Sequence, residues 1–230
     1  PTVTAYSWVP DFAQGQVRDL RVRWALEEVG QRYDVNYLAQ GEQKQPPHRA
    51  RQPFGQVPTY QDGEVTLFES GAIVLHITER FGGLLPDDPA ARVRAIAWMF
   101  AALNTVEPPI MDLAIVTIFE AGQPWSKPRQ PAVEQRIHER LKALSDRLGD
   151  KTWLDGDAFT AGDLLMVTVL RIIQGEGLVE AYDNLAAYMA RGIARPSFQK
   201  ALADQMAGFT GSPPPEFQAW LDKQKAGATA

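Results

Sequence analysis

Strand signals in this 230-residue chain are confined to its first third, where they alternate with helix signals. β-Rich segments lie at residues 2–7 and 33–38, and two more, at 57–60 and 65–68, flank the hairpin turn Asp62-Gly63. Strands joined through a helix pair in parallel, whereas a hairpin pairs its strands antiparallel. The segments therefore predict one mixed sheet.

Helix signals lie between and after these strands. Residues 18–29 are rich in good helix formers, and Ser70 opens a segment with apolar residues at helical spacing (Ile73, Val74, Ile77 and Phe81). Residues 40–53 contain three prolines, so they predict a loop with at most one short helical turn. The order β-α-β-α-β-β-α predicts an α/β domain and is similar to that of a thioredoxin-like domain.

Only helix signals remain in the rest of the chain. Pro86 and Pro89 mark a linker, and Pro213 to Pro215 precede a tail with at most one short helix. Helices are predicted at residues 90–105, 131–148, 161–173, 182–192 and 196–206. We therefore predict a thioredoxin-like domain over residues 1–84, a linker over 85–90 and an all-α helical bundle over 91–230.

The composition is that of an ordinary globular protein, with 45% hydrophobic and 22% charged residues. A net charge of −5 argues against nucleic acid as a partner, because phosphate binding requires clustered Lys and Arg. No apolar run approaches the roughly 20 residues of a membrane-spanning helix, and the first residues lack a secretory signal. We therefore expect a cytoplasmic protein without a membrane partner.

Cysteine is absent from the sequence, which excludes a disulfide framework, a zinc–thiolate site and a cysteine nucleophile. The three histidines, His48, His76 and His138, have no metal-binding spacing, so we expect no metal site. Any thiol chemistry must therefore use a thiol that the ligand brings.

Val57-Pro58 places a proline where a strand is predicted to begin. Proline has no N–H to donate, so this position is either an ordinary strand edge or a place where backbone groups stay free for a ligand. Beyond the hairpin, Glu69 and Ser70 lie at a helix start, whose free N–H groups attract a carboxylate. Ser70 suits a helix cap or a donor to that anion, and Glu69 suits an ammonium group.

The two-domain order, together with FGQVPTY (residues 54–60) and LFESGAI (67–73), resembles the cytosolic glutathione transferases, of bacterial type and unassigned class. The resemblance covers residues 3–209 and is most specific in the N-terminal motifs. It implies a homodimeric enzyme that transfers the thiolate of its co-substrate, glutathione, to a small hydrophobic electrophile. A glutathione-dependent peroxidase or disulfide reductase, and a non-catalytic binding module of the same fold, remain as alternatives.

The resemblance also assigns roles to the residues of these motifs. It implies a cis Val57-Pro58 bond, which leaves the backbone of Val57 free to pair with the cysteinyl residue of glutathione. Gln56 would help to hold the glutathione backbone, and Glu69 and Ser70 would hold the γ-glutamyl end. The glycyl carboxylate would be held from the preceding loop, for which Lys44, His48 and Gln52 are the candidates.

The thiol of glutathione must ionise, and lowering its pKa by about 2 units requires about 2.7 kcal/mol of thiolate stabilisation. In the family the donor is a Tyr at the end of the first strand, or a Ser or Cys in the loop that follows. Tyr6 is the preferred candidate, Ser7 is its neighbour, and Arg18 would act by charge instead. The loop after Ser7 is longer than usual, so its residues cannot be aligned.

In the helical domain the resemblance implies that Met111, Phe119 and Trp98 line the pocket for the electrophile. Apolar residues at helical spacing more often belong to a core, so a core role remains the alternative. Thr160 and Asp163 have the spacing of a capping box, which occurs at this place in the family and stabilises the fold.

Overall fold

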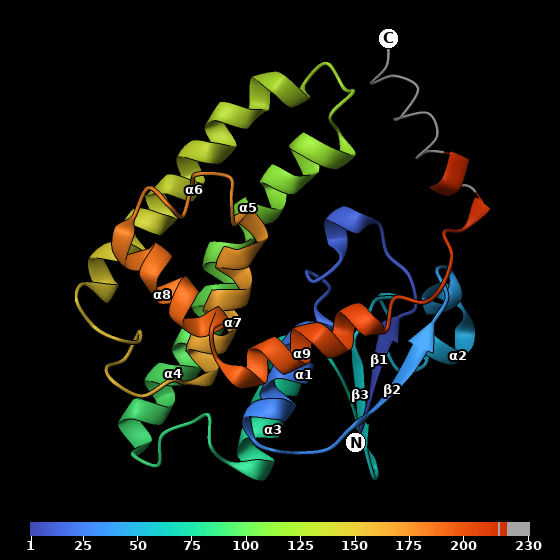
Figure 1. Ribbon diagram of the computed structural model, residues 1–230, viewed down its shortest axis with the longest axis horizontal. Coiled ribbons are helices and arrows are strands. Elements are labelled where there is room, and N and C mark those ends of the chain that lie inside the picture. The colour runs from blue at the N-terminus through green and yellow to red at the C-terminus, as the bar shows by residue number, and fades with distance from the viewer. Residues whose placement is uncertain (216, 220–230) are drawn as a thin grey trace.

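The computed structural model describes residues 1–215 and 217–219, and its two parts lie side by side (Figure 1). The N-terminal part is a sheet covered by helices, and the part that follows is a helical bundle. The predicted thioredoxin-like and all-α organisation is therefore confirmed. The boundaries at residues 84 and 91 stay predictions, and the short helix expected in the tail falls mostly outside the described residues.

The four strands follow the order β2-β1-β3-β4 in one sheet. They are Thr2–Tyr6 (β1), Asp34–Leu38 (β2), Thr59–Asp62 (β3) and Val65–Phe68 (β4). β1 and β2 are parallel, whereas β3 is antiparallel to both β1 and β4, so the mixed sheet is confirmed. β3 begins at Thr59 rather than at residue 57, because Pro58 has no N–H to donate to the ladder.

Two helices pack together on the sheet, α1 (Asp19–Glu28) and α3 (Ser70–Phe81). Ile73 and Ile77 of α3 are completely buried, and so is Trp24 of α1, whose ring packs against Phe159 and Phe198. The remaining connections carry only short helical turns: η1 (Asp11–Ala13), η2 (Glu42–Lys44) and α2 (Pro46–Arg49). The loop predicted between β2 and β3 therefore holds two turns rather than one.

The helical part surrounds α7 (Ala161–Leu170), all of whose residues are buried. The capping box is confirmed, since the Asp163 carboxylate accepts from the Thr160 N–H at 2.9 Å. The other helices of this part are α4 (Pro89–Ala101), α5 (Glu107–Ala114), α6 (Ser126–Leu148), α8 (Asp183–Ile193) and α9 (Pro196–Ala207), with the turns η3 (Ala102–Val106), η4 (Ile115–Phe119) and η5 (Arg171–Ile173).

The elements α4, η3, α5 and η4 form one continuous helix, Pro89–Phe119. The sequence predicted a helix over residues 90–105 only, because Pro108 and Pro109 lack N–H donors and clash with the preceding turn of a regular α-helix. The π-helical turn η3 lies just before them and changes the hydrogen-bond spacing there, which accommodates both prolines. We call this element the long helix.

The long helix also differs from the expectation that no apolar segment reaches membrane-spanning length. Its 31 residues are long and apolar enough to cross a membrane by length and composition alone, with a mean hydropathy of 1.3 over the apolar window. A core helix passes the same test, and here α4 packs on α7 while α5 packs on α6.

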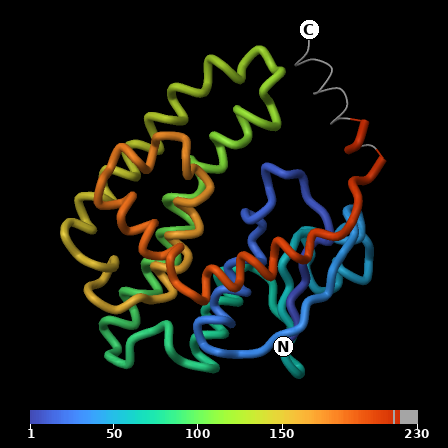
Figure 2. The backbone as a smooth tube through the Cα atoms, in the orientation of Figure 1, coloured from blue at the N-terminus to red at the C-terminus, as the bar shows by residue number. Residues whose placement is uncertain are grey.

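Helix α9 returns the chain to the α/β part, where it lies across α1 (Figures 1 and 2). Arg195, just before α9, is ion-paired with Glu28 of α1, with 2.6 Å between Nε and Oε1. After α9, the N–H of Gly211 donates to the C=O of Ser7 at 2.8 Å. The C-terminal segment therefore fastens the loop that follows β1.

Candidate functional site

Two adjoining pockets, each of about 340 Å³, lie between the α/β part and the long helix. They share a wall that consists of Arg18, Arg21, Gln56, Val57, Glu107 and Met111. The first, which we call the polar pocket, extends from this shared wall to Pro58, Glu69 and Ser70. The second, which we call the apolar pocket, extends to Tyr6 and Phe119.

Val57 lines both pockets. The Val57-Pro58 bond is cis, as the resemblance implied, and no backbone hydrogen bond between described residues uses the N–H or C=O of Val57. The C=O of Gln56 accepts from Nε2 of the buried His48 at 2.7 Å. Because the N–H and C=O of a trans peptide point in opposite directions, this bond aims the Val57 N–H away from His48.

Glu69 and Ser70 meet the polar pocket at the start of α3. Glu69 has a φ of 67°, in the left-handed region that non-glycine residues rarely adopt and that is concentrated at functional sites. The buried Ser70 hydroxyl accepts from Nη1 of Arg21 at 3.3 Å. A hydroxyl that accepts from a cation keeps its own hydrogen free, so Ser70 remains a donor for a ligand.

The shared wall contains an ionic group that the sequence analysis missed. Oε1 of Glu107, on α5, accepts from Nη2 of Arg18 at 2.7 Å and from Nη2 of Arg21 at 3.0 Å. Burial alone would raise the pKa of Glu107, but the two guanidinium groups hold that pKa below its usual value. Two cations and one carboxylate leave the wall with one net positive charge.

A sequence signal for this group does exist. Arg18 and Arg21 are three positions apart at the start of a helix, so they share one face, and cations are unfavourable at this positive end of the helix dipole. Such a pair calls for an acidic partner. Only the fold shows that the partner is Glu107, from the other part of the chain.

Tyr6 reaches the apolar pocket from the end of β1. Burial raises the pKa of its phenol to about 12, so the hydroxyl is a neutral donor at physiological pH. Met111 lies in the shared wall, and Phe119 lies at the rim with 68% of its surface exposed. The Phe119 ring meets that of Phe12 edge to face, with 6.3 Å between centroids.

Ser7 and Trp98 line neither pocket. The Ser7 hydroxyl donates to the C=O of Leu38 at 3.2 Å, on the side of β2. Trp98 packs against the hydrophobic core, which is the alternative that the sequence left open for it.

The three candidates for the glycyl carboxylate differ in position. Gln52 lines the polar pocket, with 3.5 Å between its Nε2 and Oε1 of Gln56. Lys44 does not line it, and His48 is buried beneath the Gln56 peptide. Of the three, only Gln52 therefore lines this pocket.

The long loop between β1 and α1 is held from the helical part. Nη1 of Arg171 donates to the C=O of Gly15 at 2.9 Å, and the ring of Trp8 meets that of Phe217 edge to face at 5.1 Å. These contacts fix the loop that carries Phe12 into the apolar pocket.

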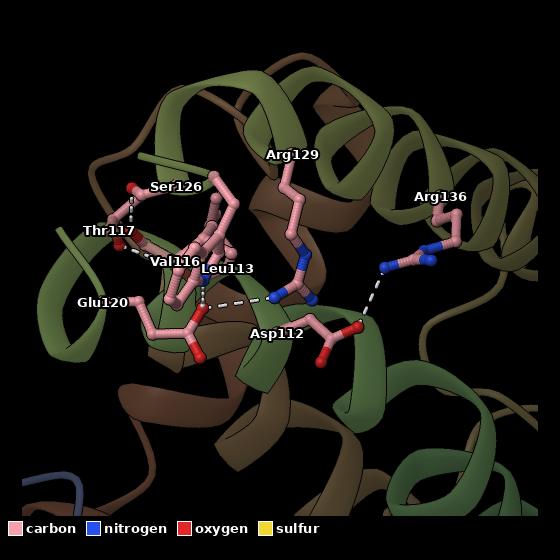
Figure 3. A network of polar contacts seen from close by, with 9 residues as sticks. Asp112, Leu113, Val116, Thr117, Glu120, Ser126, Arg129 and Arg136 are labelled. Carbon is pink, nitrogen blue, oxygen red and sulfur yellow. Dashed lines mark hydrogen bonds and ion pairs between the residues drawn. The ribbon is translucent and has the colours of Figure 1, made fainter. Parts of the chain in front are cut away.

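The far end of the long helix is tied to α6 (Figure 3). The Ser126 hydroxyl donates to the C=O of Val116 at 2.6 Å, and Arg136 pairs with Asp112 at 2.8 Å. These contacts hold the end of the long helix, which carries the rim residue Phe119, against α6. Phe119 lies across the apolar pocket from the loop that carries Phe12.

Comparison with known proteins identifies the family. Residues 1–79 match the glutathione S-transferase N-terminal domain, and residues 106–196 match the C-terminal domain. Glutathione S-transferase 4 of Zea mays is 30% identical over 229 residues, which cover 93% of this chain and 97% of the relative. The chain belongs to the glutathione S-transferase family. The expected bacterial type stays a prediction.

Other members of the family agree with this assignment. A probable glutathione S-transferase of Oryza sativa subsp. japonica is 32% identical over 76% of this chain and 86% of its own. A Pseudomonas fluorescens family member, solved with two glutathione bound, superposes with a TM-score of 0.78 at 22% identity over 87% and 92% of the two chains. Glutathione transferase F2 of Populus trichocarpa also superposes with a TM-score of 0.78, at 23% identity over 90% of this chain and 99% of its own.

Proposed function

We propose that this glutathione S-transferase binds glutathione along the polar pocket and transfers its thiolate to a small hydrophobic electrophile in the apolar pocket. The observation that carries the proposal is the position of Val57 in the wall that both pockets share. A tripeptide paired with the free backbone of Val57 places its cysteinyl side chain between the two pockets. The thiolate then lies within reach of an electrophile in the apolar pocket.

Each end of glutathione has matching groups in the polar pocket. The Ser70 hydroxyl and the first N–H groups of α3 suit the γ-glutamyl carboxylate, and Glu69 suits the ammonium group. Gln56 and Pro58 flank the cysteinyl part, and the amide of Gln52 suits the glycyl carboxylate. The site uses no metal in this proposal.

For thiol activation we favour Tyr6 as the hydrogen-bond donor, supported by the charge of Arg18. A hydrogen bond to a charged group contributes about 1.5–3 kcal/mol, which matches the roughly 2.7 kcal/mol that a two-unit fall in thiol pKa requires. Tyr6 and Arg18 both line the apolar pocket, whereas the Ser7 hydroxyl is already bonded to Leu38. Catalysis then consists of ionising the thiol and positioning it.

The mostly apolar lining of the second pocket, with Met111 and Phe119, favours an apolar electrophile over the second, charged glutathione that a peroxidase or disulfide reductase would use as its reductant. The proposal includes a homodimer in the cytoplasm that detoxifies electrophiles, as the resemblance to cytosolic glutathione transferases implies. A binding module without turnover would keep the polar pocket and lose thiol activation.

Two measurements test the proposal. Retention on immobilised glutathione measures binding, and the ultraviolet absorbance of the bound thiolate as a function of pH measures thiol activation. Ser70→Ala should weaken binding about fivefold, since it removes one hydrogen bond of about 1 kcal/mol, whereas Ser145→Ala on α6 should not.

Tyr6→Phe should lower kcat with a model electrophile about tenfold or more and leave glutathione binding nearly unchanged. Bound glutathione whose thiol pKa equals that of free glutathione would refute the mechanism.

A further inference from the structure

We infer that Glu107 is a positioning residue that sets how readily bound glutathione forms its thiolate, by neutralising one of the two cations in the shared wall. The inference rests on the proposed function, because it assumes that glutathione occupies the polar pocket. It assigns to the helical part of the chain a role at the thiol of a ligand that the α/β part holds.

The geometry connects Glu107 to both ends of the polar pocket. Arg18 and Arg21 both reach Oε1 of Glu107, and Arg21 also donates to Ser70. The side chain of Arg21 is 4% exposed and that of Glu107 is 7% exposed, so solvent screens their interaction little. Arg18 is 44% exposed and is the cation that a thiolate in the junction can approach.

The location of the thiol follows from the two pockets. The γ-glutamyl groups meet Glu69 and Ser70, which line only the polar pocket, whereas the electrophile occupies the apolar pocket. The thiol must react with the electrophile, so it lies at the wall that both pockets share. Glu107 is part of that wall and contributes its negative charge there.

The charges that face the junction can be counted. The titratable groups that line the two pockets are Tyr6, Arg18, Arg21, Glu69 and Glu107. Tyr6 is neutral, because burial raises its pKa to about 12, and Glu69 lies at the γ-glutamyl end. The two arginines and Glu107 together leave one positive charge near the thiol. Without the Glu107 carboxylate the net charge near the thiol would be +2, and without Arg18 it would be zero.

Removing the Glu107 carboxylate, although it breaks two ion pairs, should favour the thiolate. Glu107→Gln keeps the size of the side chain and removes its charge, so the apparent pKa of bound glutathione should fall by about one unit. Arg18→Gln should raise it by a similar amount. The double variant restores one positive charge and should titrate near the wild type. A merely structural salt bridge would change stability without this pattern.

Glu107→Gln should also weaken glutathione binding about fivefold, because Arg21 loses the partner that holds it against Ser70. The measurements are the thiolate absorbance of bound glutathione against pH and the Kd by calorimetry. Asp112→Asn is the matched control, since Asp112 is an acid on the same helix whose partner, Arg136, lies outside both pockets. It should change neither quantity.

An unchanged or raised thiol pKa in Glu107→Gln, with wild-type glutathione binding intact, overturns this inference and leaves the proposed function standing. Wild-type protein that does not bind glutathione overturns both. If Glu107→Gln fails to fold, the comparison of Arg18→Gln with the double variant decides the matter. A lower thiol pKa in the double variant supports the inference, and equal values overturn it.

Discussion

The imidazole of His48 donates to the C=O of the Gln56–Val57 peptide, whose N–H is proposed to bind glutathione, although His48 lines neither pocket. His48→Phe removes the 2.7 Å bond to the C=O of Gln56 and should raise the Kd for glutathione about fivefold, with a smaller change in kcat. His48→Gln keeps an N–H donor and should recover part of the loss. His138→Phe on α6 is the control. Wild-type affinity in His48→Phe would show that the Val57 peptide needs no such support.

At the same scale, the sequence predicted the residues that belong to local motifs and missed those that meet only after folding. Val57, Glu69 and Ser70, which line the polar pocket, could be proposed because each lies at a recognisable backbone feature, an X-Pro pair or a helix start. Arg21 and Glu107 lie on different parts of the chain, and no local pattern pairs them. Ser7 was proposed beside Tyr6, yet successive residues of an extended chain face opposite sides, and the hydroxyl of Ser7, just after β1, donates to Leu38 of β2.

Between elements, α7 lies close against the long helix at Gly162. A Cβ placed there would lie 2.6 Å from Cβ of Trp98 and 2.9 Å from the C=O of Ala95. Gly162→Ala should therefore lower the free energy of unfolding by about 2 kcal/mol, because backbone must move to admit the methyl group. Urea unfolding measures this. Gly122→Ala, where a Cβ meets nothing within 4 Å, should be neutral.

The junction of α1 with α9 should make stability depend on pH through Glu28. Burial raises the pKa of Glu28, but donors from Arg195, Ser197 and Trp24 bring it below 4.5. The Glu28 carboxyl therefore binds a proton more tightly in the unfolded chain than in the folded one. Ionised Glu28 stabilises the folded state fully above pH 4.5, and this stabilisation is lost as the pH falls below that value. Glu28→Gln should cost about 2 kcal/mol at pH 7 and less at pH 4, by urea unfolding at both. Asp146→Asn, in an exposed ion pair, should cost less than 1 kcal/mol. Equal losses for Glu28→Gln at the two pH values would contradict this account.

Element types were predictable because the period of the apolar residues differs between strands and helices. The stripe through Val133, Ile137 and Leu141 is buried in α6, as its spacing indicated. The long helix could not be predicted over its full length, because Pro108 normally ends a helix and the π-helical turn that accommodates it has no simple sequence pattern.

For the whole molecule, exposed apolar side chains favour the homodimer that the family resemblance implies. Phe54, Val93 and Phe100 are 67%, 66% and 59% exposed. A stable interface buries about 800 Å² per partner and uses aromatic anchors of this kind. Phe100→Glu should therefore shift the protein toward monomers in sedimentation velocity, whereas Met206→Glu on α9 should not. Wild-type protein that sediments as a monomer would remove the dimer from the proposal.

The division between the two pockets affects how such a chain can diverge. Phe12, Ile118 and Phe119 line only the apolar pocket, and Glu69 and Ser70 line only the polar pocket. Under the proposed function, substitutions of the first group change which electrophile fits without touching the groups that hold glutathione. Proteins that descend from this sequence can thus acquire new electrophile substrates one substitution at a time, while the proposed glutathione site stays unchanged.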